Sequence, residues 1–492
     1  MSVRRSGRKD RAPMMLPGGA MILFGMIAYV LAQFAVGVWV SRRVKTESDY
    51  ILAGRSLGPT LVAFSVFATW FGAEAIVATS GEVYDKGITG ALVDPLAYGF
   101  AVIAAGFLYA ALIWRQGVTT FADVFRARFS PGVEKLVVIV LLPGSVFWAA
   151  AQIRAFGQVL SSSSGLSLAN AITLAAVLVA SYSVIGGLLA DAVTDFLQGF
   201  AVIIGLIVLT IAVAIAAGGV SSALESAPAG HLTFTASAHG TPLEVVESIA
   251  VAFFGSFVAI ELISRFLGSR SAAVARGGTM AGGLMYIVVG TMPLFLGLAA
   301  SGLVRSTPEL QAKLVHSEQV VAVLSAHYLP QWHYVIFGGA LISAILSVVH
   351  SALHASGAQV SHNIVVRLSP TLGVRGKLIA ARLSVVALTA AAFVLALTSD
   401  RIKELVEIAS AFGSAGIFVS AAFGLFTRFG GARSAAISIT LGTLVWALGR
   451  FALEWEAPYL VALASSAAAY IGVALIEKSA ARIGGVDAPQ SP

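Results

Sequence analysis

Apolar runs of about 20 residues recur along nearly the whole chain, and each is long enough to cross the hydrocarbon core of a bilayer. Only helices and closed barrels span that core, because it offers no water to the backbone. These runs are continuous rather than short and alternating, which is the pattern of helices. Of the 492 residues only 11% are charged, against about 25% in soluble domains. The sequence therefore predicts an all-α polytopic membrane protein.

Hydropathy predicts about thirteen membrane spans, joined by connections short enough for one helical bundle. The predicted spans are 14–40, 58–84, 88–114, 133–161, 168–188, 192–217, 246–267, 278–303, 333–366, 378–397, 405–427, 435–451 and 458–476.

The distribution of Lys and Arg predicts the orientation, because these residues concentrate in cytoplasmic loops. They cluster after the first, third, seventh, ninth and eleventh spans. This places the C-terminus in the cytoplasm and the N-terminus outside. Residues 1–13 contradict this placement, since they hold five basic side chains on the outer side. Either one span is miscounted or translation begins at Met14, Met15 or Met21, and we favour the later start.

Two predicted spans carry glycine within an aromatic stretch near mid-membrane. Residues 68–74 read Ala-Thr-Trp-Phe-Gly-Ala-Glu, and residues 253–257 read Phe-Phe-Gly-Ser-Phe, with Glu261 downstream. Transporter sites are commonly built where a spanning helix is interrupted, because unwound carbonyls then face a cavity. Glycine also serves packing in membrane helices. Each stretch lies in the first helix of a five-helix block, however, which is the pattern of an inverted repeat.

Glu74 and Glu261 are carboxylates within spans, where a charge costs roughly 2.5–3.5 kcal/mol or more. Each should therefore pair with an internal base, a coupling ion or a cationic group of the solute. Arg154 and Arg265 are the candidate internal partners.

Aromatic and amide side chains accompany these carboxylates. Trp70 and Trp148 are suited to stacking on a ligand or to cation–π attraction of a quaternary ammonium group; the alternative is packing against neighbours or lipid. Gln152 lies one turn after Trp148, and Phe257 ends the second stretch. We expect these four side chains and the two carboxylates to contact the solute.

A polar stripe marks the span 333–366. Ser347, His350, His354 and Ser361 recur there at helical spacing. An intramembrane His titrates near neutral pH and is able to carry a proton. His350 and His354 are therefore candidates for proton coupling, although a neutral pair hydrogen-bonded within the bundle explains them equally well. Metal binding lacks a third ligand.

Several classes of chemistry find no support in the sequence. The chain has no cysteine, which excludes disulfides and Cys-ligated metal centres. It has no phosphate-cradling Gly-rich loop with Lys. The net charge of +7 is explained by basic cytoplasmic loops. We expect no enzyme activity, no organic cofactor and no nucleic acid partner, and the sequence indicates no protein partner.

Five motifs occur in combination between about residues 48 and 427. They are SDYILAGRSLG (48–58), TSGEVYDKG (79–87), GGLLADAVTDFLQ (186–198), SRFL (264–267) and AILSVVHSAL (344–353). Together they resemble the sodium/solute symporter family, whose most diagnostic signature is similar to the third. The resemblance implies a five-plus-five inverted-repeat (LeuT-like) core, with one helix before it and two after it.

This resemblance implies a division of the chain. We expect a basic segment (1–13), an extra N-terminal helix (14–40), a first five-helix repeat (58–217), a second five-helix repeat (246–427), two accessory helices (435–476) and a cytoplasmic tail (477–492).

Two stretches look most similar to the choline-transporter branch of the family, namely Ala68-Thr69-Trp70 and FWAAA at 147–151. Where that branch would place a third Trp after the second interruption, this chain has Ala259. The departure puts choline itself in doubt as the solute.

The resemblance also implies a sodium site. Carried over onto this sequence, it takes oxygens from Ala68, Phe71, Ala344 and Ser347, with Asp195 close by. Hard cations prefer such oxygen ligands. The position after Ser347 normally supplies a second hydroxyl, and here it is Val348. Loss of that oxygen should weaken sodium binding.

The sequence thus predicts a secondary active transporter that imports a small polar organic solute by alternating access, coupled to a cation, with sodium as the expected ion. The alternatives are proton-coupled or uncoupled transport using His350 and Glu74, and a non-transporting membrane sensor. We expect it in a bacterial-type inner membrane.

Overall fold

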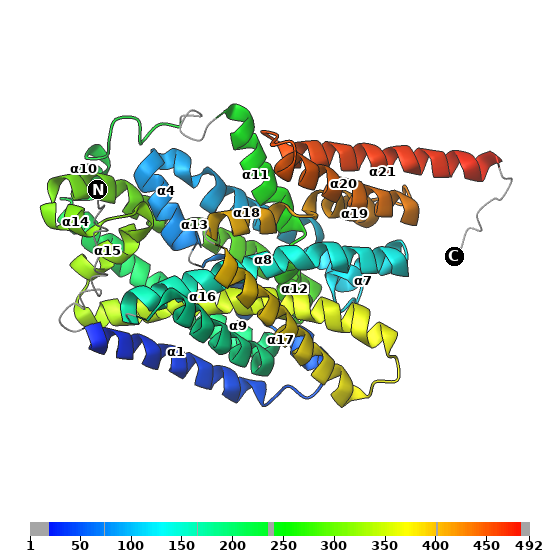
Figure 1. Cartoon of the computed structure of the whole chain (residues 1–492), viewed down its shortest axis with the longest axis horizontal. Helices are drawn as coiled ribbons and strands as arrows, with labels where there is room; N and C mark the ends of the chain where they lie inside the picture. The colour runs from blue at the N-terminus through cyan, green and yellow to red at the C-terminus, as the bar shows by residue number, and fades with distance from the viewer. Residues whose placement is uncertain (1–18, 73, 165, 235–240, 400–401, 484–492) are drawn as a thin grey trace, which may run out of the picture.

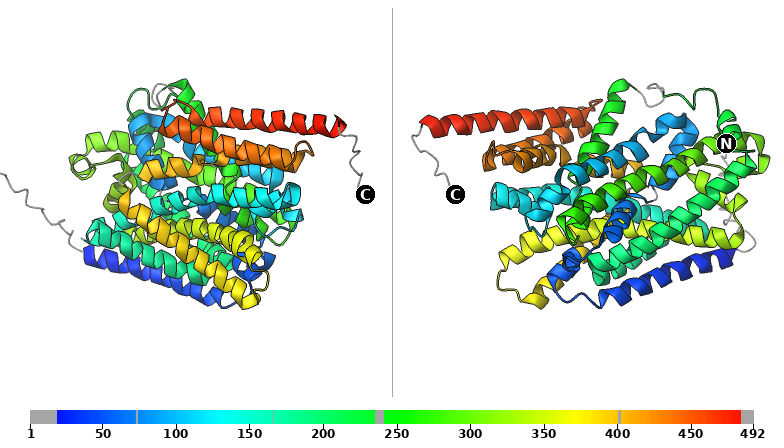
Figure 2. Two further views of the ribbon diagram at one scale, coloured as in Figure 1. Left: turned by 45° about the vertical axis from the view of Figure 1, so that its right-hand side comes forward. Right: turned by 180° about the vertical axis from the view of Figure 1, so that it is seen from behind.

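A computed structural model describes residues 19–72, 74–164, 166–234, 241–399 and 402–483 (Figures 1 and 2). The predicted basic segment 1–13 and the candidate starts Met14 and Met15 lie outside these residues, as does Ala73 of the first interruption. The regular elements of the described residues are helices, with one isolated bridge between Leu57 and Ser269.

In the first half of the chain, the described residues form fourteen helical elements. They are α1 (Gly19–Ser41), α2 (Glu47–Leu52), η1 (Ala53–Arg55), α3 (Pro59–Trp70), η2 (Glu74–Ala78), α4 (Thr79–Lys86), η3 (Gly87–Ala91), η4 (Leu92–Ala97), α5 (Tyr98–Ala105), η5 (Gly106–Ala110), α6 (Ala111–Arg115), α7 (Phe121–Arg128), α8 (Pro131–Ser164) and α9 (Leu168–Ala216).

The second half continues the same way. Its elements are α10 (Val220–Glu225), α11 (Pro242–Phe257), α12 (Ile260–Leu267), α13 (Ala272–Ser306), α14 (Pro308–Lys313), η7 (Ser317–Gln319), α15 (Val320–Tyr328), α16 (Gln331–Val360), η8 (Ser361–Val366), α17 (Val374–Thr398), α18 (Ile402–Ala411), α19 (Ser414–Phe426), α20 (Ala432–Phe451) and α21 (Pro458–Ile483).

Ten helical runs within the described residues are long and apolar enough to cross a membrane. The longest, α9, bends at Gly187, whose φ of 71° is not helical. A side chain there would press on the backbone of Tyr50, since the oxygen of Tyr50 lies 3.1 Å from where a Cβ would stand. Each of the thirteen predicted spans overlaps helix. The prediction of an all-α polytopic fold is confirmed.

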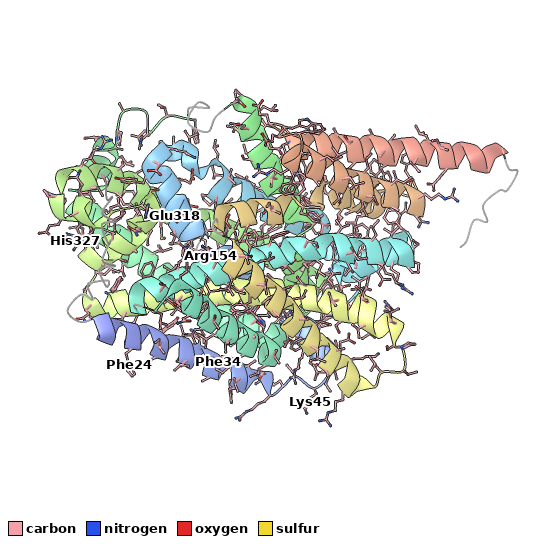
Figure 3. All side chains as sticks on the ribbon, in the orientation of Figure 1. Phe24, Phe34, Lys45, Arg154, Glu318 and His327 are labelled. Atoms are coloured by element: carbon pink, nitrogen blue, oxygen red, sulfur yellow. The ribbon has the colours of Figure 1, made fainter. Side chains whose placement is uncertain are left out.

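The bundle has a buried centre and an apolar outer surface. The central helix α16 packs on α9, α8, α1 and α17, and every residue from Ile342 to Gln359 is buried. In Figure 3, Phe24 lies on the outer side of α1, whereas Arg154 of α8 lies within the bundle. Phe24 is 72% exposed, as suits a side chain facing lipid. The last helices, α19, α20 and α21, pack together along one side (Figures 1 and 2).

The first interruption is confirmed where the sequence places it. Helix α3 ends at Trp70, and Phe71 has φ −85° and ψ 63°, outside the helical region. The amide of Gly72 donates to the carbonyl of Trp70 at 2.9 Å, so it does not make the regular bond to Ala68. The last turn of α3 therefore has carbonyls released from the helix ladder.

The second interruption lies further along than the sequence suggests. The stretch 253–257 is regular helix, and α11 gives way to α12 at Val258 and Ala259. The placement at Gly255 is wrong because this glycine serves a close approach. The carbonyl oxygen of Ser410 lies 2.7 Å from where its Cβ would stand.

A further interruption, between α18 and α19, has no counterpart in the sequence analysis. Gly413 takes φ 71° there and divides the predicted span 405–427 into two helices. The end of α18, just before this break, packs closely on two glycines. The carbonyl of Ala409 faces Gly144, and the carbonyl of Ser410 faces Gly255.

Candidate functional site

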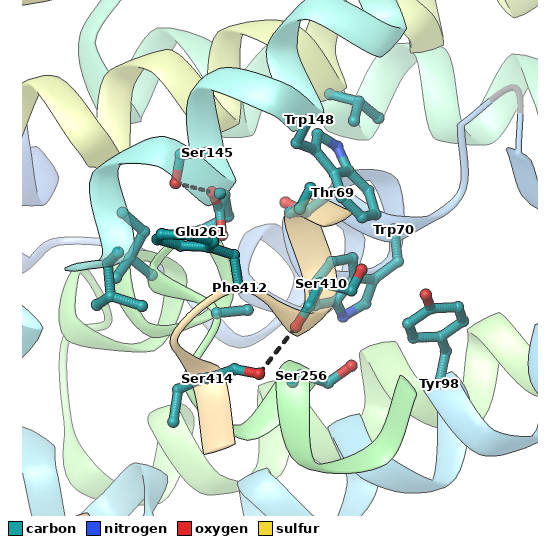
Figure 4. A pocket seen from close by; sticks show the side chains of 18 residues that line it. Thr69, Trp70, Tyr98, Ser145, Trp148, Ser256, Glu261, Ser410, Phe412 and Ser414 are labelled. Carbon is teal, nitrogen blue, oxygen red and sulfur yellow. Dashed lines mark hydrogen bonds between the residues drawn. The ribbon is translucent and has the colours of Figure 1, made fainter. Parts of the chain in front are cut away.

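A cavity lies where the three interrupted helices meet, and residues of α5, α8 and α16 complete its wall (Figure 4). Its lining comes from both halves of the chain. The residues are Thr69, Trp70, Tyr98, Leu141, Gly144, Ser145, Trp148, Gly255, Ser256, Val258, Ala259, Ile260, Glu261, Val348, Ala409, Ser410, Phe412 and Ser414.

Aromatic rings form one part of this cavity. Trp70 stands at the end of α3, and its ring meets that of Trp148 at 5.9 Å and 65°, an edge-on contact. The same indole lies 6.1 Å from the ring of Tyr98 at 29°, close to stacked. Phe412 contributes a fourth ring from the α18–α19 break (Figure 4). The faces of such rings attract cations, and the rings also pack against apolar groups.

Glu261 supplies the one charged group among the described residues that line the cavity. It sits in the first turn of α12, just after the non-helical Ala259, so the break directs it towards the cavity. Ser145 of α8 donates its hydroxyl to Glu261 Oε1 at 3.1 Å (Figure 4). A carboxylate in an apolar membrane interior favours a cationic partner.

The structure places the residues that we expect to contact the solute at different locations. Trp70, Trp148 and Glu261 line this cavity together. Phe257 lines a different cavity described below. Glu74 and Gln152 are not among the lining residues: Glu74 begins η2 beyond the break, and Gln152 is buried one turn along α8 from Trp148.

Several lining residues were missed from the sequence. Tyr98, Ser256 and Ser410 come from α5, α11 and α18, and Phe412 lies in the break between α18 and α19. Tyr98, on α5, carried no local signal, whereas Phe412 precedes Gly413 in a Phe-Gly pair like those of the two selected stretches, and this signal was not used. Ser256 was the exception, since it stands within the stretch 253–257 that the sequence analysis had selected.

The candidate ion site adjoins this cavity on α16. Ser347 donates its hydroxyl to Asp195, which also accepts from Ser65 at 2.6 Å and from Gln198 at 3.1 Å. Val348, the residue in place of a hydroxyl, packs on the first break, with its Cγ2 2.9 Å from where a Cβ of Gly72 would stand. The structure therefore brings α16, α9 and the end of α3 together at this place.

Arg265 does not serve as the expected main partner of a membrane glutamate. It is fully buried and binds Asp191 and Ser351, and its Nε donates to Thr69 Oγ1 at 3.0 Å. Asp195 Oδ2 lies 3.9 Å from the guanidinium. Burial demands this arrangement, because a charge inside the bundle is tolerated only when it is compensated. Arg154 donates from one guanidinium nitrogen to the carbonyl oxygen of Ala396 at 2.9 Å.

His350 and His354 face the same buried network. His350 Nε2 lies 3.6 Å from Asp191 Oδ1, and His354 Nε2 lies 2.8 Å from the carbonyl of Tyr50. Both histidines are essentially unexposed. No group of three or more metal-ligating side chains gathers within the described part of the chain.

Broken helices that meet at a polar and aromatic cavity inside a helical bundle define a membrane transporter with a LeuT-like fold. A Na+-coupled sialic acid symporter has the same architecture: the TM-score is 0.81, with 17% identity, over 93% of this chain and 98% of that one. A nucleobase-cation-symport-1 family transporter gives a TM-score of 0.59 over 88% of this chain and 95% of that one, at 14% identity.

The chain belongs to the sodium:solute symporter family, whose model matches residues 50–442. It is 25% identical to a high-affinity choline transporter of Caenorhabditis elegans over 409 residues, which cover 78% of this chain and 70% of that protein. It is 27% identical to a sodium/glucose cotransporter of Vibrio parahaemolyticus over 58% of this chain and 56% of that one. The matched part spans about a third of the human choline transporter, 33% of its length, at 29% identity. Family membership supports cation-coupled symport through a multi-pass membrane protein.

Proposed function

We propose that the protein imports a small polar organic solute with a positive charge, together with sodium, by alternating access. The observation that carries this proposal is Glu261, the one charged side chain among the described lining residues, facing the rings of Trp70 and Trp148. A carboxylate beside aromatic rings suits an ammonium group, through charge and cation–π attraction. Relatives whose names specify choline and glucose differ in their solutes, so the cavity is the better guide.

The cavity also argues for a compact solute. Its polar groups are hydroxyls, from Thr69, Ser145, Ser256 and Ser410 among others, and Ser145 already bonds to Glu261. An amine able to donate hydrogen bonds would use these acceptors as well as the carboxylate. Ala259 leaves an open side where a third Trp would close a quaternary ammonium cage, which favours an amine over choline.

For sodium we propose the carbonyls of Ala68, Phe71 and Ala344 with the hydroxyl of Ser347, and Asp195 behind it. The geometry that supports this choice is the interrupted end of α3 beside α16. Thr69 connects the solute cavity with the proposed sodium site, because it lines the cavity and accepts a hydrogen bond from Arg265. Sodium binding that holds α3 against α16 would favour one conformer, and the solute would then bind that conformer more tightly.

The decisive experiment is uptake into proteoliposomes, with an imposed sodium gradient and a panel of amines, amino acids, carboxylates and sugars. We expect sodium-driven accumulation of a cationic solute. Glu261→Gln should raise the KM for that solute about tenfold or more, because hydrogen bonds to charged groups contribute roughly 1.5–3 kcal/mol. Glu225→Gln, on the exposed helix α10, is the matched control. Accumulation of a carboxylate or a sugar with equal KM in both variants would refute the cationic solute.

Proton coupling is the second candidate, favoured by the 3.6 Å approach of His350 to Asp191. It predicts uptake driven by a pH gradient without sodium, and loss of that uptake in His350→Gln. Sodium-driven uptake that His350→Gln leaves intact decides for the first candidate. Absence of accumulation under every gradient would instead favour a membrane sensor.

We also propose an orientation with the C-terminus in the cytoplasm, in a bacterial-type inner membrane, on the basis of the Lys and Arg distribution. The absence of native cysteine makes this easy to test by single-cysteine labelling. Thr371→Cys should be protected from an impermeant maleimide in intact cells, and Ser317→Cys should react. The reverse pattern would invert the topology.

A further inference from the structure

A second cavity lies behind the α11–α12 break, on the far side of that helix from the solute cavity. It has a volume of about 210 Å³ and is lined by Leu108, Tyr109, Phe121, Phe253, Phe257, Val258, Phe418, Ala421, Ala422, Leu425 and Phe426. An apolar cavity of roughly 150 Å³ already binds a small hydrocarbon and stays dry. This one is therefore large enough for part of an alkyl chain.

The chemistry of the lining excludes water as the occupant. Tyr109 carries the one polar side-chain atom among the described lining residues, and its hydroxyl donates to the carbonyl of Phe257 at 2.5 Å. A buried water needs two to four polar partners. Since the hydroxyl is already bonded inside the protein, the cavity offers water too few partners.

The cavity is continuous with the surface that faces lipid. Leu108 of η5 is 46% exposed, and Phe426 at the end of α19 is 55% exposed. Both rim residues are large and apolar, on a bundle whose outer surface contacts hydrocarbon. The molecules that reach such an opening are lipids, whose acyl chains match the lining.

Two cationic side chains flank this opening. The guanidinium of Arg276 lies 4.8 Å from the ring centre of Phe107, the neighbour of Leu108. Arg428 follows Phe426 by two residues and is exposed. Arg276 lies near the start of α13 and Arg428 between α19 and α20. The Lys and Arg distribution assigns both places to the cytoplasmic side, where the leaflet is rich in anionic lipids.

We propose that this cavity holds one acyl chain of an anionic phospholipid, whose headgroup phosphate lies between Arg276 and Arg428. The chain would contact Phe257 and Val258 at the α11–α12 break, and Val258 also lines the solute cavity. Occupancy therefore supports the wall of the solute cavity from behind. The lipid is a ligand of the transporter in addition to its solvent.

The test is photolabelling of the full-length protein in nanodiscs, with phosphatidylglycerol or phosphatidylcholine carrying a diazirine near the middle of one acyl chain. We expect labelled peptides from 253–258 and 418–426. Ala421→Phe should abolish this labelling by filling the cavity. Ala390→Phe, on an exposed face of α17, is the matched control and should leave it unchanged.

The headgroup contacts are tested separately. Arg276→Gln and Arg428→Gln should each lower phosphatidylglycerol labelling about fivefold. One basic residue near an anionic headgroup strengthens the binding of that lipid by about this amount. Phosphatidylcholine labelling should be weaker and insensitive to both changes. Labelling that survives Ala421→Phe overturns the site, and equal labelling by both lipids overturns the anionic preference. Both readouts are independent of transport, so they stand apart from the identity of the solute.

Discussion

The buried pair of Arg265 and Asp191 offers a sharp test of how the bundle interior is balanced. Both side chains are at most 1% exposed. Removing one partner of such a pair costs about 3–5 kcal/mol, because the other charge stays buried without compensation. Asp191→Asn leaves Arg265 with Asp195 at 3.9 Å, so we expect a loss near the lower end, about 3 kcal/mol. Arg265→Met leaves two carboxylates together, so we expect about 5 kcal/mol.

The double variant Asp191→Asn/Arg265→Met should cost less than the sum of the two losses, by about 2 kcal/mol or more, because the residues interact directly. The assay is reversible unfolding in mixed micelles, followed by tryptophan fluorescence. Glu82→Gln breaks the more exposed pair with Lys86 and should change stability by less than about 1 kcal/mol. Single variants that each cost under about 1 kcal/mol, or that add without interaction, would refute the reasoning.

Three other variants probe the ion site, a break and a polar network. Val348→Ser restores a hydroxyl at the proposed sodium site and should lower the sodium concentration for half-maximal uptake; an unchanged value would place sodium elsewhere. Gly413→Ala should destabilise the protein by about 1–3 kcal/mol, because φ is 71° and Val140 Cγ1 lies 2.1 Å from the new Cβ; a normal unfolding midpoint would contradict this. Asn363→Ala removes a bond of 2.8 Å to the buried Glu134, which should cost about 1–3 kcal/mol in the same assay.

The sequence was most informative where function and local structure share the same residues. The first interruption was found at Phe71 and Gly72 because a glycine, an aromatic run and a carboxylate coincide there. Gly187, where α9 bends, lies one residue before the predicted end of the span 168–188. Trp70, Trp148 and Glu261 were expected to share a site, and they line one cavity. Their contact with a solute remains a prediction.

The errors share a physical origin in packing between distant segments. Gly255 resembled a helix break, yet it accommodates the carbonyl of Ser410. Gly413 follows Phe412 in a similar Phe-Gly pair and was not selected, yet it is the one that bends the chain. A glycine either lets another segment approach its backbone closely or takes a positive φ. Which of the two applies depends on a neighbouring segment that lies far away in the sequence.

By itself the sequence determined that the protein spans a lipid bilayer, that its backbone is helical, and to which family it belongs. Membrane crossing follows from the length and hydrophobicity of each run, and the bilayer then obliges the backbone to be helical. Tertiary structure alone decided which charges meet. Arg265 was expected near a glutamate, but the packing of α12 against α16 placed it on Asp191 of α9 and Ser351 of α16. Compensation of a buried charge depends on distances of a few ångströms between helices, and no periodicity along one helix contains that information.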